Sequence, residues 1–232
     1  MKMTAPEYTL TKEEKRFQKY HHRLMRETMI ARAHLKLWER LENYKSDYLG
    51  ELNQARHFFT FTTGAHLDDT LLILSRILDK RGRDAPLTIW TFLNFAEQNL
   101  EIFSTPAFKK RVGHKAHYDD FWIQEHTPIT RKEINEDRKK LTEVESTISK
   151  LMTWRDKVIA HIDRRFLIGE SISKKYPLQY QELQRVVNTL AEILNRYSRA
   201  YESLQYYEGF PNEDDVQLIM DCIRFYIQEH NK

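Results

Sequence analysis

Arg155 and His161, near the end of one predicted helix, are the residues of this chain best suited to chemistry. Five residues separate them, and Asp156 directly follows Arg155. An imidazole titrates near neutral pH and can transfer a proton, whereas a guanidinium keeps its charge and can bind phosphate. This arrangement has the chemistry needed to cleave a phosphodiester, with Arg155 stabilising the charge that develops on the phosphate.

Arg155 also interrupts an apolar pattern. Between residues 134 and 163, apolar side chains recur at the three- and four-residue spacing of a buried helical face. They are Leu141, Val144, Ile148, Leu151, Val158 and Ile162. At ~100° per residue, Arg155 falls on the same face. A guanidinium cannot lose its charge on burial, so it needs a partner, an interface or a functional role. Asp68, Asp69 and Glu145 are candidate partners, and solvent exposure of the two aspartates is the alternative.

The elements that must position these residues are helices. Capping boxes at Thr11–Glu14 and Thr130–Glu133 predict helices over about 12–44 and 130–162. Apolar periodicity predicts further helices over about 47–79, 88–103, 177–207 and 212–232, whereas 105–128 lacks a clear pattern. Only 6 Gly and 6 Pro occur in 232 residues, too few for many short strands. We therefore expect an all-α fold, an antiparallel bundle of five or six helices, several of them long.

Composition bounds the class of protein. No linker divides the chain, so we expect one helical domain over 1–232, with a loose tail at 1–10 and a C-terminal helix at 212–232. The formal net charge of +3 is compatible with a polyanionic partner. Cys222 is the sole cysteine, so no disulfide can form within the chain, and no apolar run is long enough to span a bilayer. A cytoplasmic protein without a membrane partner is expected.

Histidines elsewhere offer weaker signals. Four residues with metal-binding side chains lie close together in the sequence: His114, His117, Asp120 and His126. Such spacing is common by chance, so we expect no metal and no cofactor. His21 and His22 are adjacent on the first helix and cannot share a face, and both are expected at the surface.

Two basic segments, 109–115 and 164–175, can follow an RNA backbone. The cations that we expect to contact RNA are Lys109, Lys110, Arg111, Lys115, Arg164 and Arg165. Tyr118, Phe121 and Trp122 are available to stack on bases. Acidic residues are mixed into both neighbourhoods, and an ordinary solvated surface is the alternative.

The spacing of Arg155, Asp156 and His161 resembles the mark of the HEPN superfamily. In that motif an arginine, a polar residue and a later histidine lie in the last part of a helix. The segment 74–79, followed by a polar loop and Pro86-Leu87-Thr88, resembles the abortive-infection AbiU-like branch. The resemblance covers about residues 56–163.

This resemblance implies a helical bundle that forms a homodimer and brings two motifs into one cleft. It implies a metal-independent endoribonuclease of a toxin or phage-defence type, with RNA as substrate and an antitoxin-type protein as partner. The ribose 2′-hydroxyl attacks the adjacent phosphate, with His161 as acid and base, Arg155 stabilising the transition state, and Asp156 orienting both. A non-catalytic HEPN-type module that binds RNA or protein is the alternative, and an unrelated helical bundle is a third hypothesis.

Overall fold

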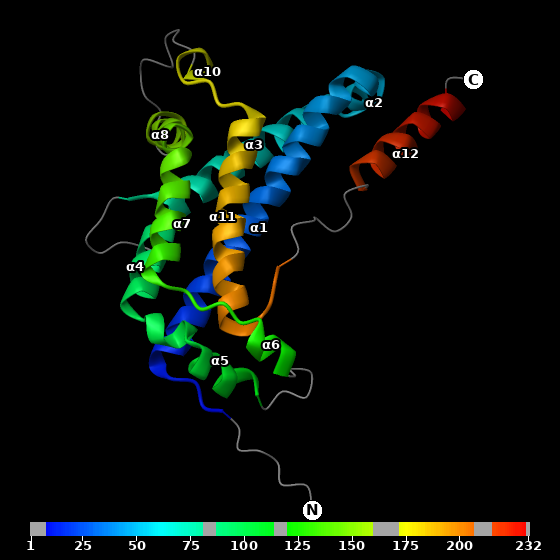
Figure 1. Ribbon diagram of the computed structural model, residues 1–232. Coiled ribbons are helices and arrows are strands. Elements are labelled where there is room, and N and C mark those ends of the chain that lie inside the picture. Colours follow the sequence, from blue (N-terminus) through cyan, green and yellow to red (C-terminus); the bar gives the residue numbers. More distant parts are fainter. Residues whose placement is uncertain (1–7, 81–86, 114–119, 160–171, 207–214, 231–232) are drawn as a thin grey trace, which may run out of the picture. The chain divides into compact units, whose positions relative to one another are not determined.

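A computed structural model describes residues 8–80, 87–113, 120–159, 172–206 and 215–230. Every regular element in these ranges is a helix (Figure 1), which confirms the predicted all-α class. In chain order they are α1 (Lys12–Asp47), α2 (Leu49–Gln54), α3 (Arg56–Leu78), α4 (Ile89–Gln98), η1 (Leu100–Phe103), α5 (Thr105–Val112), α6 (Asp120–Gln124), α7 (Arg131–Glu143), α8 (Glu145–Trp154), η2 (Arg155–Ile159), α10 (Ile172–Lys175), α11 (Tyr180–Glu202) and α12 (Asp215–His230). None of the helices in the described ranges is long and apolar enough to cross a bilayer.

Capping residues begin three of these helices where the sequence predicts. At α1, the Thr11 backbone N–H donates to the Glu14 carboxylate over 2.8 Å, and the Glu14 N–H donates to the Thr11 hydroxyl over 3.1 Å. Thr130 and Glu133 form the same reciprocal box at α7, and Thr88 caps α4. Each box pairs backbone N–H groups that the first helical turn leaves without a carbonyl partner.

The single helix predicted over 47–79 is wrong. Helix α1 continues to Asp47, and non-helical backbone at Tyr48 (φ −130°) and Ala55 (φ −133°) separates it from α2 and α3. The side chains of this stretch pack with residues distant in sequence in one apolar cluster: Leu41, Tyr48, Leu52, Phe59, Val216 and Met220. Two of these residues belong to α12, which is distant in sequence. The apolar periodicity within 47–79 therefore could not predict the two breaks at Tyr48 and Ala55.

The straight helix predicted over 130–162 is also wrong. Val144 leaves helical geometry (φ −105°, ψ 11°) between α7 and α8, and the helix widens at Arg155 into a π-helical turn, η2. Leu141, Ile148 and Leu151 are nevertheless buried, as is Val144. A break of one residue leaves the order of apolar positions intact, so the sequence pattern does not reveal it.

The described helices group into two compact units. Unit 1 comprises residues 1–27, 76–146 and 188–207, and unit 2 comprises residues 28–75, 147–187 and 208–232. Helices α1, α3 and α11 contribute residues to both units. The interpretation of 1–232 as one helical domain stays a prediction.

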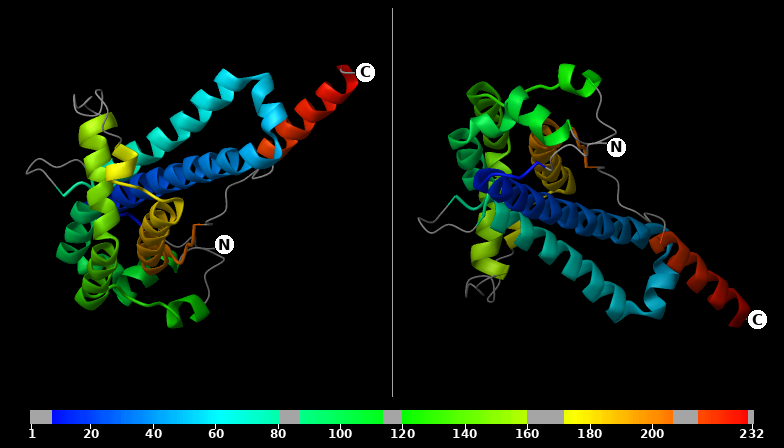
Figure 2. Two further views of the ribbon diagram at one scale, coloured as in Figure 1. Left: turned by 90° about the horizontal axis from the view of Figure 1, so that it is seen from above. Right: turned by 90° about the horizontal axis from the view of Figure 1, so that it is seen from below.

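An aromatic core holds unit 1 together. The Phe17 ring of α1 meets Phe103 edge-on with centroids 5.0 Å apart, and Phe92 of α4 meets Tyr197 of α11 in the same manner at 5.0 Å. Helices α4 and α11 accordingly lie beside the first half of α1 (Figure 2). Edge-to-face pairs of this kind add to the free energy gained by burying the rings.

His21 belongs to this core, so its predicted surface position is wrong, whereas His22 is exposed as expected. The His21 ring stacks on Phe17 with centroids 5.5 Å apart, and its Nε2 lies 2.9 Å from the Leu194 carbonyl oxygen. Burial lowers the pKa of His21, although the Leu194 carbonyl opposes this shift. A neutral imidazole that donates to a carbonyl is a satisfied core residue.

Asp137 gives unit 1 a pH-dependent stability. Its side chain is fully buried, and burial raises the pKa of the carboxyl to about 6, although Arg196 at 3.1 Å acts in the opposite direction. The unfolded chain holds this proton less tightly than the native state. The stability contributed by Asp137 therefore falls as pH rises from about 4 to about 6. At pH 7 the buried charge costs the native state up to about 3 kcal/mol.

We expect Asp137→Asn to raise the free energy of unfolding by about 1–3 kcal/mol at pH 7 and to change it little at pH 4. Urea denaturation at the two pH values measures the difference. Glu125→Gln removes an exposed carboxylate of the same unit and should show no such dependence. An equal effect of Asp137→Asn at both pH values would contradict the assigned titration.

Candidate active site

Arg155 opens the π-helical turn that follows α8, in unit 2. Its side chain is 19% exposed, and that of Asp156 is 43% exposed. The Nε and NH2 atoms of Arg155 lie 2.8 and 2.7 Å from the same Asp156 oxygen. A π-helical turn is rare and is frequently found at functional sites. The arginine is thus neither fully buried nor loosely solvated, and a neighbouring carboxylate sets the direction of its guanidinium.

Contacts within unit 2 fix the end of α8, which directly precedes Arg155. The Trp154 indole N–H donates to the Tyr176 carbonyl over 2.8 Å. One turn earlier, Lys150 Nζ lies 2.6 Å from Glu182 of α11. Tyr180, at the start of α11, packs its ring near Trp38 of α1 with centroids 6.3 Å apart. The segment around 176–182 therefore ties the π-helical turn that contains Arg155 to α1 and α11.

The predicted acidic partners of Arg155 have other contacts. Glu145 forms an ion pair with Lys80 at 2.6 Å. Asp69 lies 3.6 Å from Nδ1 of His34, and Asp68 is exposed. Arg155 instead pairs with the adjacent Asp156, which belongs to the motif itself.

Four of the predicted site residues lie outside the described residues: His161, Lys115, Arg164 and Arg165. The described part of the site is therefore Arg155 with Asp156. The predicted roles of His161 as acid and base, and of Arg164 and Arg165 as RNA contacts, stay predictions.

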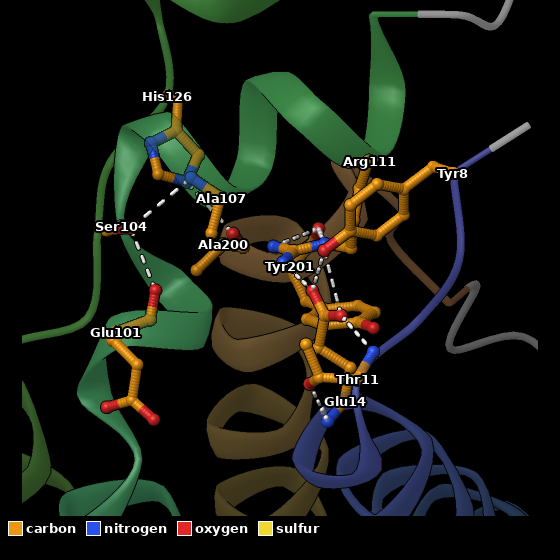
Figure 3. Close-up of polar contacts among 10 residues, drawn as sticks. All are labelled: Tyr8, Thr11, Glu14, Glu101, Ser104, Ala107, Arg111, His126, Ala200 and Tyr201. Carbon is orange, nitrogen blue, oxygen red and sulfur yellow. Dashed lines mark hydrogen bonds and ion pairs between the residues drawn. The ribbon is translucent and has the colours of Figure 1, made fainter. Parts of the chain in front are cut away.

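The basic segment that begins at Lys109 divides into exposed and buried cations. Lys109 and Lys110 are exposed on α5 and remain predicted RNA contacts. Arg111 is only 5% exposed, and its NH1 lies 2.6 Å from the Glu14 carboxylate. Figure 3 shows the two side chains facing each other. The Nε and NH2 of Arg111 donate to the Tyr201 carbonyl oxygen. This guanidinium is committed inside unit 1, so we leave Arg111 out of the RNA-contacting set.

Of the three histidines considered as metal ligands, only His126 lies within the described ranges. His114 and His117 fall outside them. His126 stacks on Phe108 with ring centroids 4.3 Å apart, and its nitrogens contact the Thr105 hydroxyl and the Ala200 carbonyl. Burial lowers the pKa of His126, which keeps the ring neutral for these contacts. Among the described residues, no group of three or more His, Cys, Asp and Glu could hold a metal ion.

Among the residues available for stacking, Phe121 is exposed on α6, and Tyr118 lies outside the described residues.

A second set of residues that could contact RNA was not predicted from the sequence. Exposed cations recur along the first half of α1 at three- and four-residue spacing: Lys12, Lys15, Arg16, Lys19, Arg23 and Arg26. Helical periodicity applied to charged residues, in the way it was applied to apolar ones, would have found this row.

Comparison with known proteins confirms the superfamily that the sequence resembles. No curated protein and no solved structure matches the chain significantly. The sequence model of the AbiU2 family, a branch of the HEPN superfamily, matches residues 14–219 and so spans both units. Arg155, Asp156 and His161 lie within the matched range. The chain therefore belongs to the AbiU2 family of the HEPN superfamily.

Proposed function

We propose that this chain is a metal-independent endoribonuclease of a toxin or phage-defence type, with a composite Arg155/His161 site at a homodimer interface. Membership of the AbiU2 family supports an abortive-infection role. The observation that carries the proposal is the Arg155 guanidinium, part-exposed and paired with Asp156 at the start of a π-helical turn. His161 follows that turn in the sequence.

The pairing with Asp156 suits Arg155 to bind a phosphate in a transition state. Asp156 holds the Nε–NH2 edge and so restricts rotation of the guanidinium plane. A cation that is already oriented loses less conformational entropy when the charge on the phosphate develops. Arg155 also keeps its charge at every pH at which RNA is cleaved.

In the proposed reaction the ribose 2′-oxygen forms a bond to phosphorus, and the bond from phosphorus to the 5′-oxygen breaks. A base takes the proton of the 2′-hydroxyl, and an acid gives a proton to the departing 5′-oxygen. Two copies of His161, one from each protomer, can fill these two roles. The products are a 2′,3′-cyclic phosphate and a 5′-hydroxyl.

A dimer cleft also suits the environment of Arg155 better than a dry core does. A cleft lets the guanidinium remain hydrated while a neighbouring carboxylate orients it. On this proposal, the chain acts in the cytoplasm, and an antitoxin-type protein that covers the cleft would silence it.

Incubating purified protein with RNA in excess EDTA tests the proposal. We expect cleavage to continue without divalent metal and to leave cyclic phosphate ends, because side chains supply all the charge and proton transfer. Cleavage that stops in EDTA would contradict metal independence. Binding of RNA without any cleavage would instead favour the non-catalytic binding module.

A further inference from the structure

A row of cations covers the exposed side of the first half of α1, within unit 1. The row consists of Lys12, Lys15, Arg16, Lys19, Arg23 and Arg26, all of which are exposed. At ~100° per residue they fall within a sector of about 100°, and the row is about 21 Å long. Exposed His22 borders it. One face of a single helix therefore carries six positive charges in line.

Little on this face neutralises the row. Only two acidic residues occur between Lys12 and Arg26: Glu14 is buried against Arg111, and Glu13 is half-buried outside the sector. Arg23 does form an ion pair with Glu27 at 2.8 Å.

Within the row, Arg16 donates to the Tyr20 hydroxyl. Lys12, Lys15, Lys19 and Arg26 have no ion pair with any residue in the described ranges. Four of the six cations of the row are therefore available to an anionic ligand.

A hollow of about 320 Å³ adjoins the row and is lined in part by Lys19 and His22. Tyr206 and the half-buried Glu202 form another wall of it, so the hollow also contains one carboxylate. The backbone N–H of Tyr206 donates to Asn195 Oδ1 over 2.8 Å, and the Asn195 amide donates back to the Tyr206 carbonyl over 3.3 Å. Asn195 is itself buried, so this clasp fixes the chain that carries the aromatic ring. A lysine of the row and an aromatic ring on a fixed stretch of backbone therefore lie beside one hollow.

The form of the row excludes a membrane surface. A helix that lies on a bilayer needs an apolar face that is available for the lipid. The apolar face of this half of α1 is already buried in unit 1, with Phe17, Leu24 and Met25 each at most 2% exposed. The exposed side offers charge without apolar side chains to insert.

A nucleic-acid strand fits both the row of cations on α1 and the hollow beside Tyr206. Cations three or four residues apart are about 5–6 Å apart along the helix, a spacing that lets successive side chains reach successive phosphates. The adjoining hollow offers Tyr206 as a stacking surface for a base that is not held in a duplex. A duplex could contact the row but could not place a paired base in the hollow.

We propose that the α1 row and the Tyr206 hollow bind single-stranded RNA, the row through phosphates and Tyr206 through a base. This inference rests on the proposed ribonuclease function and names its substrate class. It assigns RNA contact to residues of unit 1 that lie outside the Arg155 motif.

The test uses the full chain carrying His161→Ala, so that bound RNA is not cleaved, with fluorescently labelled single-stranded RNA and its duplex. Replacing Lys15, Lys19 and Arg26 together by glutamine should weaken single-strand binding about 100-fold near 0.1 M salt. The slope of log K against log salt should fall by about 2 to 3, because three phosphate contacts are lost. The matched control replaces three exposed α7 cations, Arg131, Lys132 and Lys139, by glutamine and should bind normally.

Tyr206 provides the second arm of the test. Tyr206→Ala should weaken single-strand binding about tenfold and leave duplex binding unchanged, whereas Tyr206→Phe should bind normally because it keeps the ring. Equal losses in the α1 and α7 triple variants would overturn the row as a site. Equal affinity for single-stranded and duplex RNA, measured with the α1 row and Tyr206 unchanged, would overturn the single-strand assignment. Displacement of the RNA by polyglutamate at an equal concentration of charge would show that the row binds an acidic protein instead.

Failure of this inference can be told apart from failure of the nuclease proposal. If the protein with His161 restored binds RNA through the row but cuts nothing in EDTA, the row stands and the nuclease proposal fails. If it cuts RNA and the row variant cuts with an unchanged KM, the nuclease proposal stands and the row fails.

Discussion

Alanine at His161 or at Arg155 is expected to reduce RNA cleavage by about 10²–10⁴-fold. On the proposed mechanism, His161→Ala removes proton transfer, and Arg155→Ala removes the cation that stabilises charge on the phosphate in the transition state. The initial rate of formation of cyclic phosphate ends measures both effects. Circular dichroism and thermal unfolding should show that each variant keeps its helices.

Conservative variants separate chemistry from structure. Arg155→Lys keeps the charge but loses the planar fork held by Asp156, so we expect an intermediate loss of rate. Arg131→Ala and His230→Ala remove exposed residues of the same types and should cleave normally. Cleavage that persists in both Arg155→Ala and His161→Ala would remove the motif from the mechanism.

The largest loss of stability is expected from breaking the Glu14–Arg111 ion pair in unit 1. Figure 3 shows the Glu14 carboxylate between Arg111, the Tyr8 hydroxyl and the backbone of Thr11. The two paired side chains are only 2% and 5% exposed. The Arg111 guanidinium also lies 4.0 Å from the centre of the Tyr201 ring. Both charges are therefore satisfied by each other and by nearby polar groups.

Arg111→Met should lower the free energy of unfolding by about 3–5 kcal/mol, because it leaves the Glu14 charge buried without its cation. Adding Glu14→Leu should recover much of this loss, since neither charge then has to be desolvated. Urea denaturation measures the free energies of the single and double variants. Lys140→Met, which breaks the more exposed ion pair with Glu192, should cost less than about 1 kcal/mol. A similarly small cost for Arg111→Met would show that the buried pair is not a main determinant of stability.

The pH dependence of this pair has the opposite sign to that of Asp137. Burial tends to raise the pKa of Glu14, but hydrogen bonds from Thr11 and Arg111 outweigh it, and the net pKa is lowered. The stability that Glu14 contributes is therefore present above the usual Glu range and is lost as pH falls through the folded-state pKa. Asp137, with its raised pKa, loses stability as pH rises.

Local signals in the sequence were sufficient for the helix class and for several helix starts. The capping boxes at Thr11 and Thr130 depend on residues three positions apart, so the sequence contains the whole interaction. The same holds for the spacing of Arg155, Asp156 and His161, which led to the superfamily that the family match confirms. The burial of Ile148 and Leu151 likewise follows from their helical spacing.

Contacts between distant residues decided what the local pattern could not. Arg111 was predicted to reach RNA because it lies among lysines, but Glu14, 97 positions away, holds it inside unit 1. His21 was expected at the surface from its neighbour, but the Leu194 carbonyl and the Phe17 ring hold it in the core. A charge pattern does not show which cation has a buried partner.

By itself, the sequence determined that this protein is helical and where several of its helices begin. It also determined that Arg155 interrupts an apolar helical face and that His161 follows it in the sequence. These properties depend on backbone hydrogen bonds and on residues within a few positions of each other. The tertiary structure alone decided the breaks at Tyr48, Ala55 and Val144, the π-helical turn at Arg155 and the pairing of Arg111. Most of these outcomes depend on packing between segments far apart in the chain. The residue pattern of a single helix does not reveal which distant segment packs against it.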